Sequence, residues 1–226
     1  MKKILLSLVA IVLFTMNMSA QKEFAGIVKS KVYVEDENID PSIRAQYPIA
    51  LELKVLNNKT RTDMNQQGAG MTQIQDGENN KNYFVVDLTA FNMAVYYTEL
   101  PTSNEKAKFD YQYDKNDRKT VAGFDCYKVT CTVTDLETDE MQDIIFYISD
   151  DFLPNFKSMT YIGLTGFPLY TKMEIKTEDF QYFQIEEVET IEASKKIKVT
   201  NFLLPSNAVE MTDEVKAMLG MKNGGE

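Results

Sequence analysis

The sequence predicts a mainly β protein built on a single, strongly curved antiparallel sheet, a half-barrel with a C-terminal covering helix. The first observation is period-2 alternation of apolar and polar residues, which is typical of strands with one buried face. The second is that these runs recur roughly every 8 to 15 residues, from about residue 23 to about residue 202, with turn residues between them. Because no linker, internal repeat or low-complexity segment interrupts them, we expect one meandering sheet.

The strands follow from the alternation. The clearest run places Ile49, Leu51, Leu53 and Val55 on one face, and charged residues stand between them. Similar runs predict strands within residues 24–34, 127–134, 144–148 and 169–176. Turn chemistry separates the strands at Asn57-Asn58, Gly68-Ala69-Gly70, Asp76-Gly77, Asn79-Asn80, Asn116-Asp117 and Ala122-Gly123.

Helical signals are sparse. Ala208, Met211, Val215 and Met218 fall on one face of a C-terminal helix. That helix is predicted to begin after a cap at residue 207 or at residue 212, and glycine 220 is its natural end. Residues 41–46 could form a single turn, and residues 155–164 either a short helix or an irregular cover.

The N-terminus has the layout of a secretory signal peptide. Lys2 and Lys3 precede an apolar run over 4–14, and a polar stretch then leads to the small residue Ala20. The apolar run is shorter than the roughly 20 residues that a membrane-spanning helix needs. We therefore expect residues 1–20 to be removed and residues 21–226 to form one exported domain, in the periplasm or secreted, with no stable membrane span. No cysteine follows the apolar run, which argues against lipid attachment there.

The composition argues against an enzyme. The chain has no histidine, which removes the commonest general base and the usual activating partner of a nucleophile. Its formal net charge of −10 makes nucleic acid an unfavourable partner. The Gly68-Ala69-Gly70 stretch lacks the lysine and the βαβ context of a phosphate-binding loop. We predict no catalytic residue and no cofactor.

The two cysteines are predicted to be unpaired thiols. Cys126 and Cys131 lie in one expected strand, where residues five apart point to opposite faces and stand roughly 16 Å apart. A disulfide needs Cα atoms within about 7 Å. A bulge or turn that divided the strand would be the only route to a bridge.

No metal site is predicted. Residues 36–40 begin like a calcium-binding EF-hand loop, but Pro41 replaces its glycine and Tyr47 stands where a bidentate glutamate is needed. A second acidic group, at an expected hairpin tip, is more simply a solvated turn; it consists of Asp135, Glu137, Asp139 and Glu140.

Several segments together resemble a known family. They are Phe24-x-Gly26, Lys59-Thr-Arg61-Thr-Asp63-Met64, Met71-x-x-Ile74-x-Asp76, Lys119-Thr-Val-Ala-Gly123-Phe-Asp-Cys126-Tyr-Lys128 and Gly166-Phe-Pro168-Leu-Tyr170. In this order the chain resembles the DUF4412-type exported proteins of Bacteroidetes, which look like relatives of the periplasmic lipoprotein carriers LolA and LolB. The resemblance implies a half-barrel closed by helices around an apolar cavity for acyl chains. The carriers have several covering helices, whereas this sequence predicts one clearly.

The resulting expectation is a non-catalytic binding protein that holds a lipid, a lipoprotein acyl chain or another apolar ligand in its concave face. Methionine-rich walls suit apolar ligands of varied shape. The expected ligand-binding residues are Leu51, Leu53, Arg61, Met64, Met71, Phe146, Met173, Met211 and Val215. Arg61 would line or rim the cavity, or else be an exposed strand arginine. The alternative is an envelope or secreted interaction module with a filled core, whose tyrosine-rich strand edge would meet a protein partner.

Overall fold

The computed structural model describes residues 23–35, 39–47, 49–66, 69–88, 92–99, 106–176 and 180–218. The N-terminal half of this part contains β1 (Ala25–Val34), α2 (Pro41–Arg44), β2 (Ile49–Leu56), β3 (Lys59–Gln66), β4 (Ala69–Asp76), β5 (Lys81–Leu88) and β6 (Met93–Glu99). The remainder contains β7 (Ala107–Val121), β8 (Phe124–Asp135), β9 (Met141–Ile148), β10 (Pro168–Lys176), β11 (Gln181–Ala193), a 3-10 turn η3 (Val199–Phe202), β12 (Ala208–Glu210) and α3 (Asp213–Met218).

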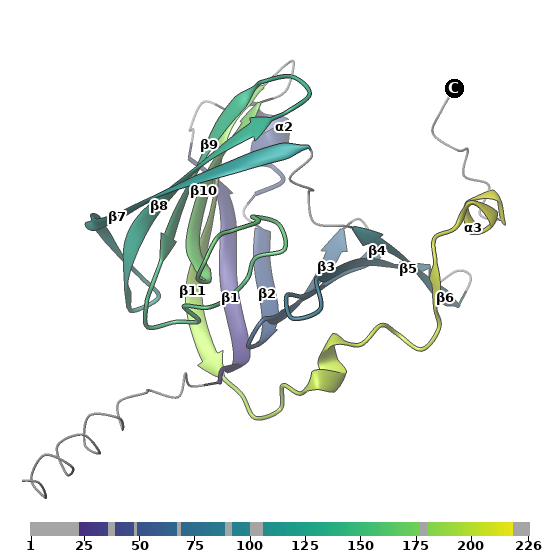
Figure 1. Cartoon of the computed structure of the whole chain (residues 1–226). Coiled ribbons are helices and arrows are strands. Elements are labelled where there is room, and N and C mark those ends of the chain that lie inside the picture. Colours follow the sequence, from purple (N-terminus) through teal and green to yellow (C-terminus); the bar gives the residue numbers. More distant parts are fainter. Residues whose placement is uncertain are drawn as a thin grey trace, which may run out of the picture.

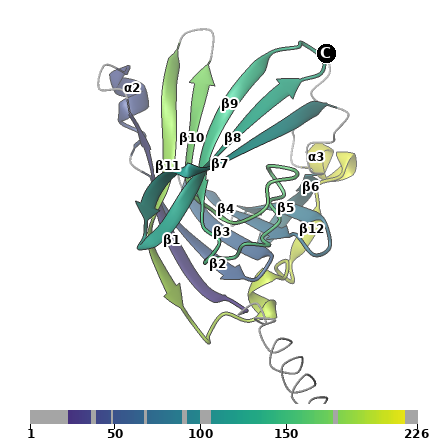
Figure 2. The same ribbon diagram turned by 60° about the vertical axis from the view of Figure 1, so that its left-hand side comes forward.

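All the strands of the described residues belong to one sheet, in the order β12-β6-β5-β4-β3-β2-β1-β11-β10-β9-β8-β7. Neighbouring strands are antiparallel except β12, which runs parallel to β6. The sheet curves strongly without closing, so that β2 to β6 form one arm and β7 to β11 the other (Figures 1 and 2). The predicted fold class, a single curved antiparallel sheet, is confirmed.

An irregular segment, residues 149–167, covers the concave side of the sheet; we call this side the inner face and this segment the inner loop (Figure 2). Its phenylalanines, Phe152, Phe156 and Phe167, share a core cluster with Val28 and Val55 of the sheet. It also bridges the two arms through two hydrogen bonds. The Lys157 backbone N–H donates to the Asn58 side-chain oxygen (3.1 Å), and the Gln75 amide donates to the Thr160 hydroxyl (3.4 Å). Of the two predicted alternatives for this region, the structure shows the irregular cover.

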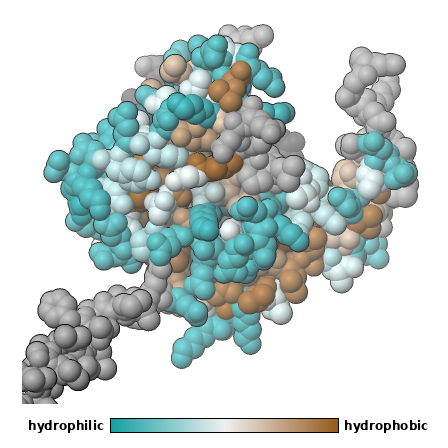
Figure 3. All heavy atoms as spheres, in the orientation of Figure 1, coloured by the Kyte–Doolittle hydropathy of each residue, from teal (hydrophilic) through white to brown (hydrophobic). Residues whose placement is uncertain are grey.

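A second cover lies on the outer face of the other arm. Ile197, Phe202 and Leu204 follow β11 and pack against outer-face side chains of β4 and β5, among them Ile74 and Val85. In Figure 3 apolar surface gathers along this extended segment, which runs from the end of β11 toward α3. The segment therefore covers apolar outer-face residues of β2, β4, β5 and β6, and η3 is its one regular element before β12 among the described residues.

The tip of the β7–β8 hairpin packs back onto the sheet through an aromatic and charged contact. The Lys119 ammonium lies 3.6 Å from the centre of the Tyr170 ring and 3.0 Å from the Glu187 carboxylate. Tyr170 is 8% exposed, so this cation–π contact is largely sheltered from water. The contact holds the long hairpin against β10 and β11.

The predicted C-terminal helix is shorter than its sequence pattern indicates. Residues 208–210 form strand β12, and the helix occupies only Asp213–Met218. The Thr212 hydroxyl accepts a hydrogen bond from the Val215 backbone N–H (3.3 Å), so the second of the two predicted starts is correct. The helix predicted from the apolar spacing does not include Ala208, because this residue belongs to a strand and packs against the outer-face cluster that contains Ile74 and Val85.

The predicted turn at Asn116-Asp117 is wrong, since both residues lie inside β7. The Asp114 carboxylate accepts hydrogen bonds from both of their backbone N–H groups, and the strand absorbs this local turn as a bulge that shifts its register against β8. The predicted turn at Ala122-Gly123 is confirmed: both residues have positive φ, 49° and 84°.

The cysteine prediction is confirmed, because Cys126 and Cys131 are free and buried. The expected signal peptide lies outside the described residues, as do the glycines predicted at positions 68 and 220. In the described part of the chain no helix has the length and apolar character to span a membrane. Residues 41–44 form α2, the single turn that the sequence predicted.

Candidate functional site

A groove of about 900 Å³ opens at the rim of the sheet, at the ends of β7 to β10; we call it the rim groove. Its lining joins inner-face residues to Glu174 and Lys176, which alternate to the outer face of β10. Its apolar lining comes from Ala107 of β7, Val133 of β8, and Met173 and Ile175 of β10. All four stand at strand positions that face inward. Its remaining lining is polar or flexible and consists of Asp135, Glu140, Met141, Gln142, Glu174 and Lys176. The volume lies in the range of small-molecule binding sites.

A second groove of about 430 Å³ adjoins the first at Ala107. Phe109 and Tyr111 of the edge strand β7 form one wall, and Ile162 and Gly163 of the inner loop form the other. The Tyr111 hydroxyl donates a hydrogen bond to the Ile162 carbonyl oxygen (3.0 Å), which fixes the loop to the strand at the back of this groove. The two grooves together follow the inner side of β7.

The inner face of the other arm carries half-buried apolar residues outside the three core clusters. Met64 of β3 lies directly opposite Met71 of β4, and Phe84 of β5 stacks on Tyr97 of β6 with ring centres 5.2 Å apart. None of these four residues belongs to a core cluster of the described residues. This surface therefore lies outside the packed core clusters of the described residues.

One carboxylate, that of Glu186, lies within the inner face rather than at its rim. The Ser30 hydroxyl donates a hydrogen bond to it (2.9 Å), and Glu186 pairs in register with Thr171 of β10. Burial raises the pKa of Glu186 above its ordinary value, and the Ser30 hydrogen bond opposes the rise only partly. Burial and the nearby Glu186 charge also raise the pKa of Tyr161 in the inner loop.

Replacing Glu186 by glutamine should stabilise the protein at neutral pH. A carboxyl whose pKa is higher in the folded state than in the unfolded state weakens folding once pH exceeds the unfolded value of about 4.3. Glutamine carries no charge and can still accept the Ser30 hydrogen bond. The gain in the free energy of unfolding should be about 1.4 kcal/mol for each unit of pKa elevation.

The measurement is urea unfolding of both proteins between pH 4 and pH 8. The difference between them isolates Glu186, because carboxyls with lowered pKa, such as Asp63 and Asp76, are common to both. The advantage of the variant should shrink toward zero as pH falls to about 4. A difference that stays constant with pH would show that Glu186 keeps its ordinary pKa.

The structure distributes the predicted ligand-binding residues over several environments. Leu51, Leu53, Met64 and Met71 lie on the inner face of β2 to β4, and Met173 lines the rim groove. Phe146 also points inward, but it is fully buried beneath Tyr161, with ring centres 4.7 Å apart.

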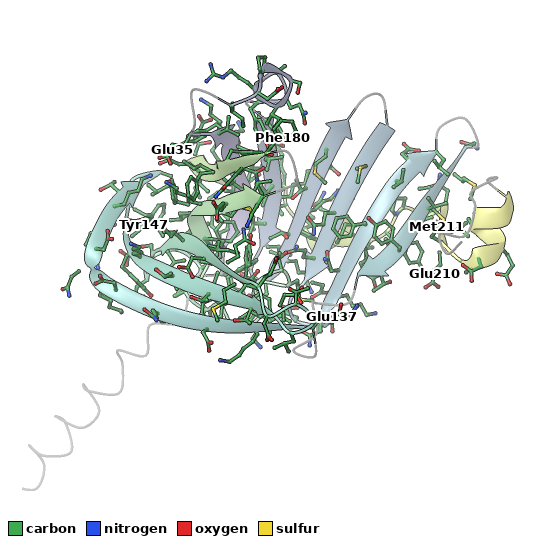
Figure 4. All side chains as sticks on the ribbon, turned by 90° about the horizontal axis from the view of Figure 1, so that it is seen from above. Glu35, Glu137, Tyr147, Phe180, Glu210 and Met211 are labelled. Carbon is green, nitrogen blue, oxygen red and sulfur yellow. The ribbon has the colours of Figure 1, made fainter. Side chains whose placement is uncertain are left out.

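Three of the predicted residues lie away from the inner face. Arg61 points to the outer face, where its side chain pairs with Asp63 (2.8 Å) and donates to the Asn201 carbonyl oxygen (3.3 Å). Met211 and Val215 lie at the far edge of the sheet, on and beside α3 (Figure 4). The expectation that Arg61 lines or rims the cavity is therefore corrected, and its alternative, a strand arginine on a polar face, is what the structure shows.

Sequence reasoning missed Val133 and Ile175 as lining residues of the rim groove, and it missed Glu186 as an inner-face residue. Val133 and Ile175 lie in runs of alternating apolar and polar residues, so their inward orientation could be predicted from the sequence. The inward orientation of Glu186 could not be predicted, because this residue stands beside Glu187 in an acidic stretch that is typical of a solvent-exposed strand.

The acidic group predicted at a hairpin tip does lie there, between β8 and β9, and Figure 4 shows Glu137 at this tip. The Asp135 carboxylate accepts hydrogen bonds from the backbone N–H groups of residues 137 and 138, as in an ordinary acidic turn. Among the described residues no three acidic or cysteine side chains are grouped so as to hold a metal ion.

The fold and the grooves define a class of protein: an open, curved antiparallel β-sheet whose inner face is partly covered by a loop and partly exposed in grooves. No family model and no curated protein matches the sequence. A structural match was found to the crystal structure of MucB, with 12% sequence identity and a TM-score of 0.32. That match covers 83% of this chain, and the chain spans 58% of the length of MucB.

Proposed function

We propose that this protein binds a lipid or another elongated apolar ligand on the inner face of its sheet, as a non-catalytic exported carrier or binding protein. The observation that carries the proposal is the rim groove, whose volume of about 900 Å³ suits a small apolar molecule. The sequence resemblance to the DUF4412-type proteins and the lipoprotein carriers supports the same function. A lipoprotein acyl chain is one form that such a ligand could take.

The inner face supports binding in two ways. The apolar residues of the groove, such as Met173 and Ile175, are only half-buried, so a ligand would remove further apolar area from water. The methionine pair Met64 and Met71 extends apolar surface along the other arm. Thioether side chains adapt to ligands of different shapes, which suits chains of varied length.

A second candidate function is an interaction module that meets an envelope protein. The observation that favours it is the filled part of the inner face, where the inner loop buries Phe146 completely. The strand β7 would then receive the partner, since it is an edge strand of the sheet that the described residues form, and an edge strand can pair with another chain. Exposed Tyr113 would contribute to such a contact.

Titration of the purified, delipidated protein with a fluorescent alkyl-chain probe tests the proposal. Saturable binding that a non-fluorescent chain displaces is the expected result, and the probe should bind at one site. Absence of saturable binding would leave the interaction module as the better description.

Replacing Ile175 by asparagine should weaken binding of that probe by about tenfold. The reason is that burying an isoleucine side chain is worth about 1.5–3 kcal/mol, and a polar amide in the groove loses this contribution. Ile175 belongs to none of the described core clusters, so the fold should tolerate the change. The matched control is Val199→Asn, at a residue 58% exposed on the outer cover. Equal affinities in the two variants would place the ligand elsewhere.

A further inference from the structure

The charges of the inner face restrict the head group of its ligand, an inference that rests on the proposed function. Lysines and arginines of the sheet point to the outer face. Examples are Lys54 and Lys59, which pair with outer-face carboxylates at 2.8 Å and 2.6 Å, and Arg61. Among the described strand residues the exceptions lie at the tip of the β7–β8 hairpin, beyond its bulge. No described inner-face position within β1 to β5 or β9 to β11 is a lysine or an arginine.

The rim groove is acidic as well. Three carboxylates line it, those of Asp135, Glu140 and Glu174, against the single ammonium of Lys176. The adjoining groove adds Lys108, but this lysine is paired with Asp110 at 2.6 Å. A concave surface lined mainly by one sign of charge attracts ligands of the opposite sign. An anionic head group would meet repulsion at the entrance and no lysine or arginine at the described inner-face positions of β9 to β11 behind it.

A further carboxylate, that of Glu186, lies on the inner face next to the groove, beyond the residues that line it. Met173 lines the groove and pairs in register with Gln184, so Glu186 is its diagonal neighbour on the same face, with Cα atoms roughly 7–8 Å apart. Among the described residues its side chain accepts a hydrogen bond from the neutral Ser30 hydroxyl and forms no salt bridge. A half-buried carboxylate without a cation is unfavourable alone and would be stabilised by a ligand ammonium.

We propose that the ligand of the inner face carries a positively charged head group on its apolar chain, and that Glu186 is the carboxylate that selects this charge. The apolar chain then lies along Met173 and Ile175 and their neighbours, and the ammonium lies within reach of Glu186. Ser30 and Thr171 are neutral and add hydrogen-bonding groups beside it. Fatty carboxylates are disfavoured ligands of this site.

Three probes with the same ten-carbon chain test the proposal: decylamine, decanol and decanoate, each used to displace a neutral fluorescent alkyl probe at neutral pH and low salt. Decylamine should bind at least tenfold more tightly than decanoate, with decanol between them. Raising the salt concentration should reduce this ratio, since screening weakens the attraction at the exposed rim.

Two variants that change the net charge equally test whether Glu186 causes the preference for amine over carboxylate. Glu186→Gln should reduce the decylamine-to-decanoate ratio at least threefold, while Glu210→Gln, at an exposed residue at the far edge of the sheet, should leave it unchanged. Equal affinity for amine and carboxylate, or an unchanged ratio in Glu186→Gln, would overturn this proposal and leave the binding function standing. If none of the three chains displaced the probe, the binding function itself would fail.

Discussion

Replacing Phe146 by alanine should lower the free energy of unfolding by about 3–5 kcal/mol. The ring is 0% exposed and lies at the centre of the cluster that joins β8 and β9 to the inner loop. Removing it deletes the edge-to-face contact with Tyr161 and leaves a cavity between the sheet and the loop. Chemical denaturation with fluorescence detection would measure the loss.

The matched control is Phe183→Ala, the same substitution at a ring that is 41% exposed on the outer face. Phe183 contacts Lys172, whose ammonium lies 4.5 Å from the ring centre, and such an exposed contact is worth about 0.5–1 kcal/mol. Equal losses in the two variants would contradict the assignment of Phe146 to a closed core. This residue was expected to contact ligand, and the prediction separates the two roles: a ligand contact would leave stability largely unchanged.

The strands were predictable because alternation is a local signal. Ile49, Leu51, Leu53 and Val55 lie on one face of β2 as expected, since each packs on the inner side while Glu52 faces out. The turn at residues 122–123 was equally readable, because two successive residues with positive φ favour glycine at that position. These features need no knowledge of distant contacts.

The pairing of strands was not predictable, because it depends on residues far apart in the chain. β1 pairs with β11, which lies roughly 160 residues later, and this pairing brings Ser30 to Glu186. β11 also lost its simple alternation: Ile185 and Val188 are 2% and 4% exposed although they point to opposite faces. Both faces of the sheet are covered there, so burial no longer follows period 2 and Glu186 could not be recognised as an inner-face residue.

The segments that cover the two faces of the sheet were also not predictable from the sequence. The short strand β12 forms where the apolar spacing predicted the start of a helix, since the segment can pair with β6 and pack Ala208 against the outer cluster. Tertiary pairing overrides a weak local preference in a three-residue element. The inner loop likewise is held in place by Phe152 and Phe167, which pack in the core cluster. Because the loop sequence has no regular apolar period, the direction in which these rings point could not be predicted.

Replacing Gly26 by alanine should destabilise the protein by about 3 kcal/mol, at the upper end of the usual range for overpacking. A Cβ atom at Gly26 would lie 2.3 Å from the Glu192 carbonyl oxygen and 2.5 Å from the Phe24 ring. The ring could turn away, but the carbonyl belongs to β11, which pairs with β1, so the two strands would have to separate. This explains the Phe24-x-Gly26 pattern physically: the phenylalanine ring packs edge-to-face on Phe152 (5.0 Å), and the glycine leaves room for it.

Gly70→Ala provides the matched comparison, because it is also a glycine in an antiparallel strand and its Cβ would meet an ordinary contact at 3.5 Å. Alanine restricts the unfolded chain more than glycine does, so this variant should be neutral or more stable by up to about 1 kcal/mol. Thermal unfolding separates the two variants, since each kcal/mol shifts the midpoint by roughly 2–4 °C in a domain of this size. If Gly26→Ala unfolded at the temperature of Gly70→Ala, the close approach of β11 to β1 at residue 26 would be wrong, and the inner-face register that places Glu186 beside Ser30 would need to be revised with it.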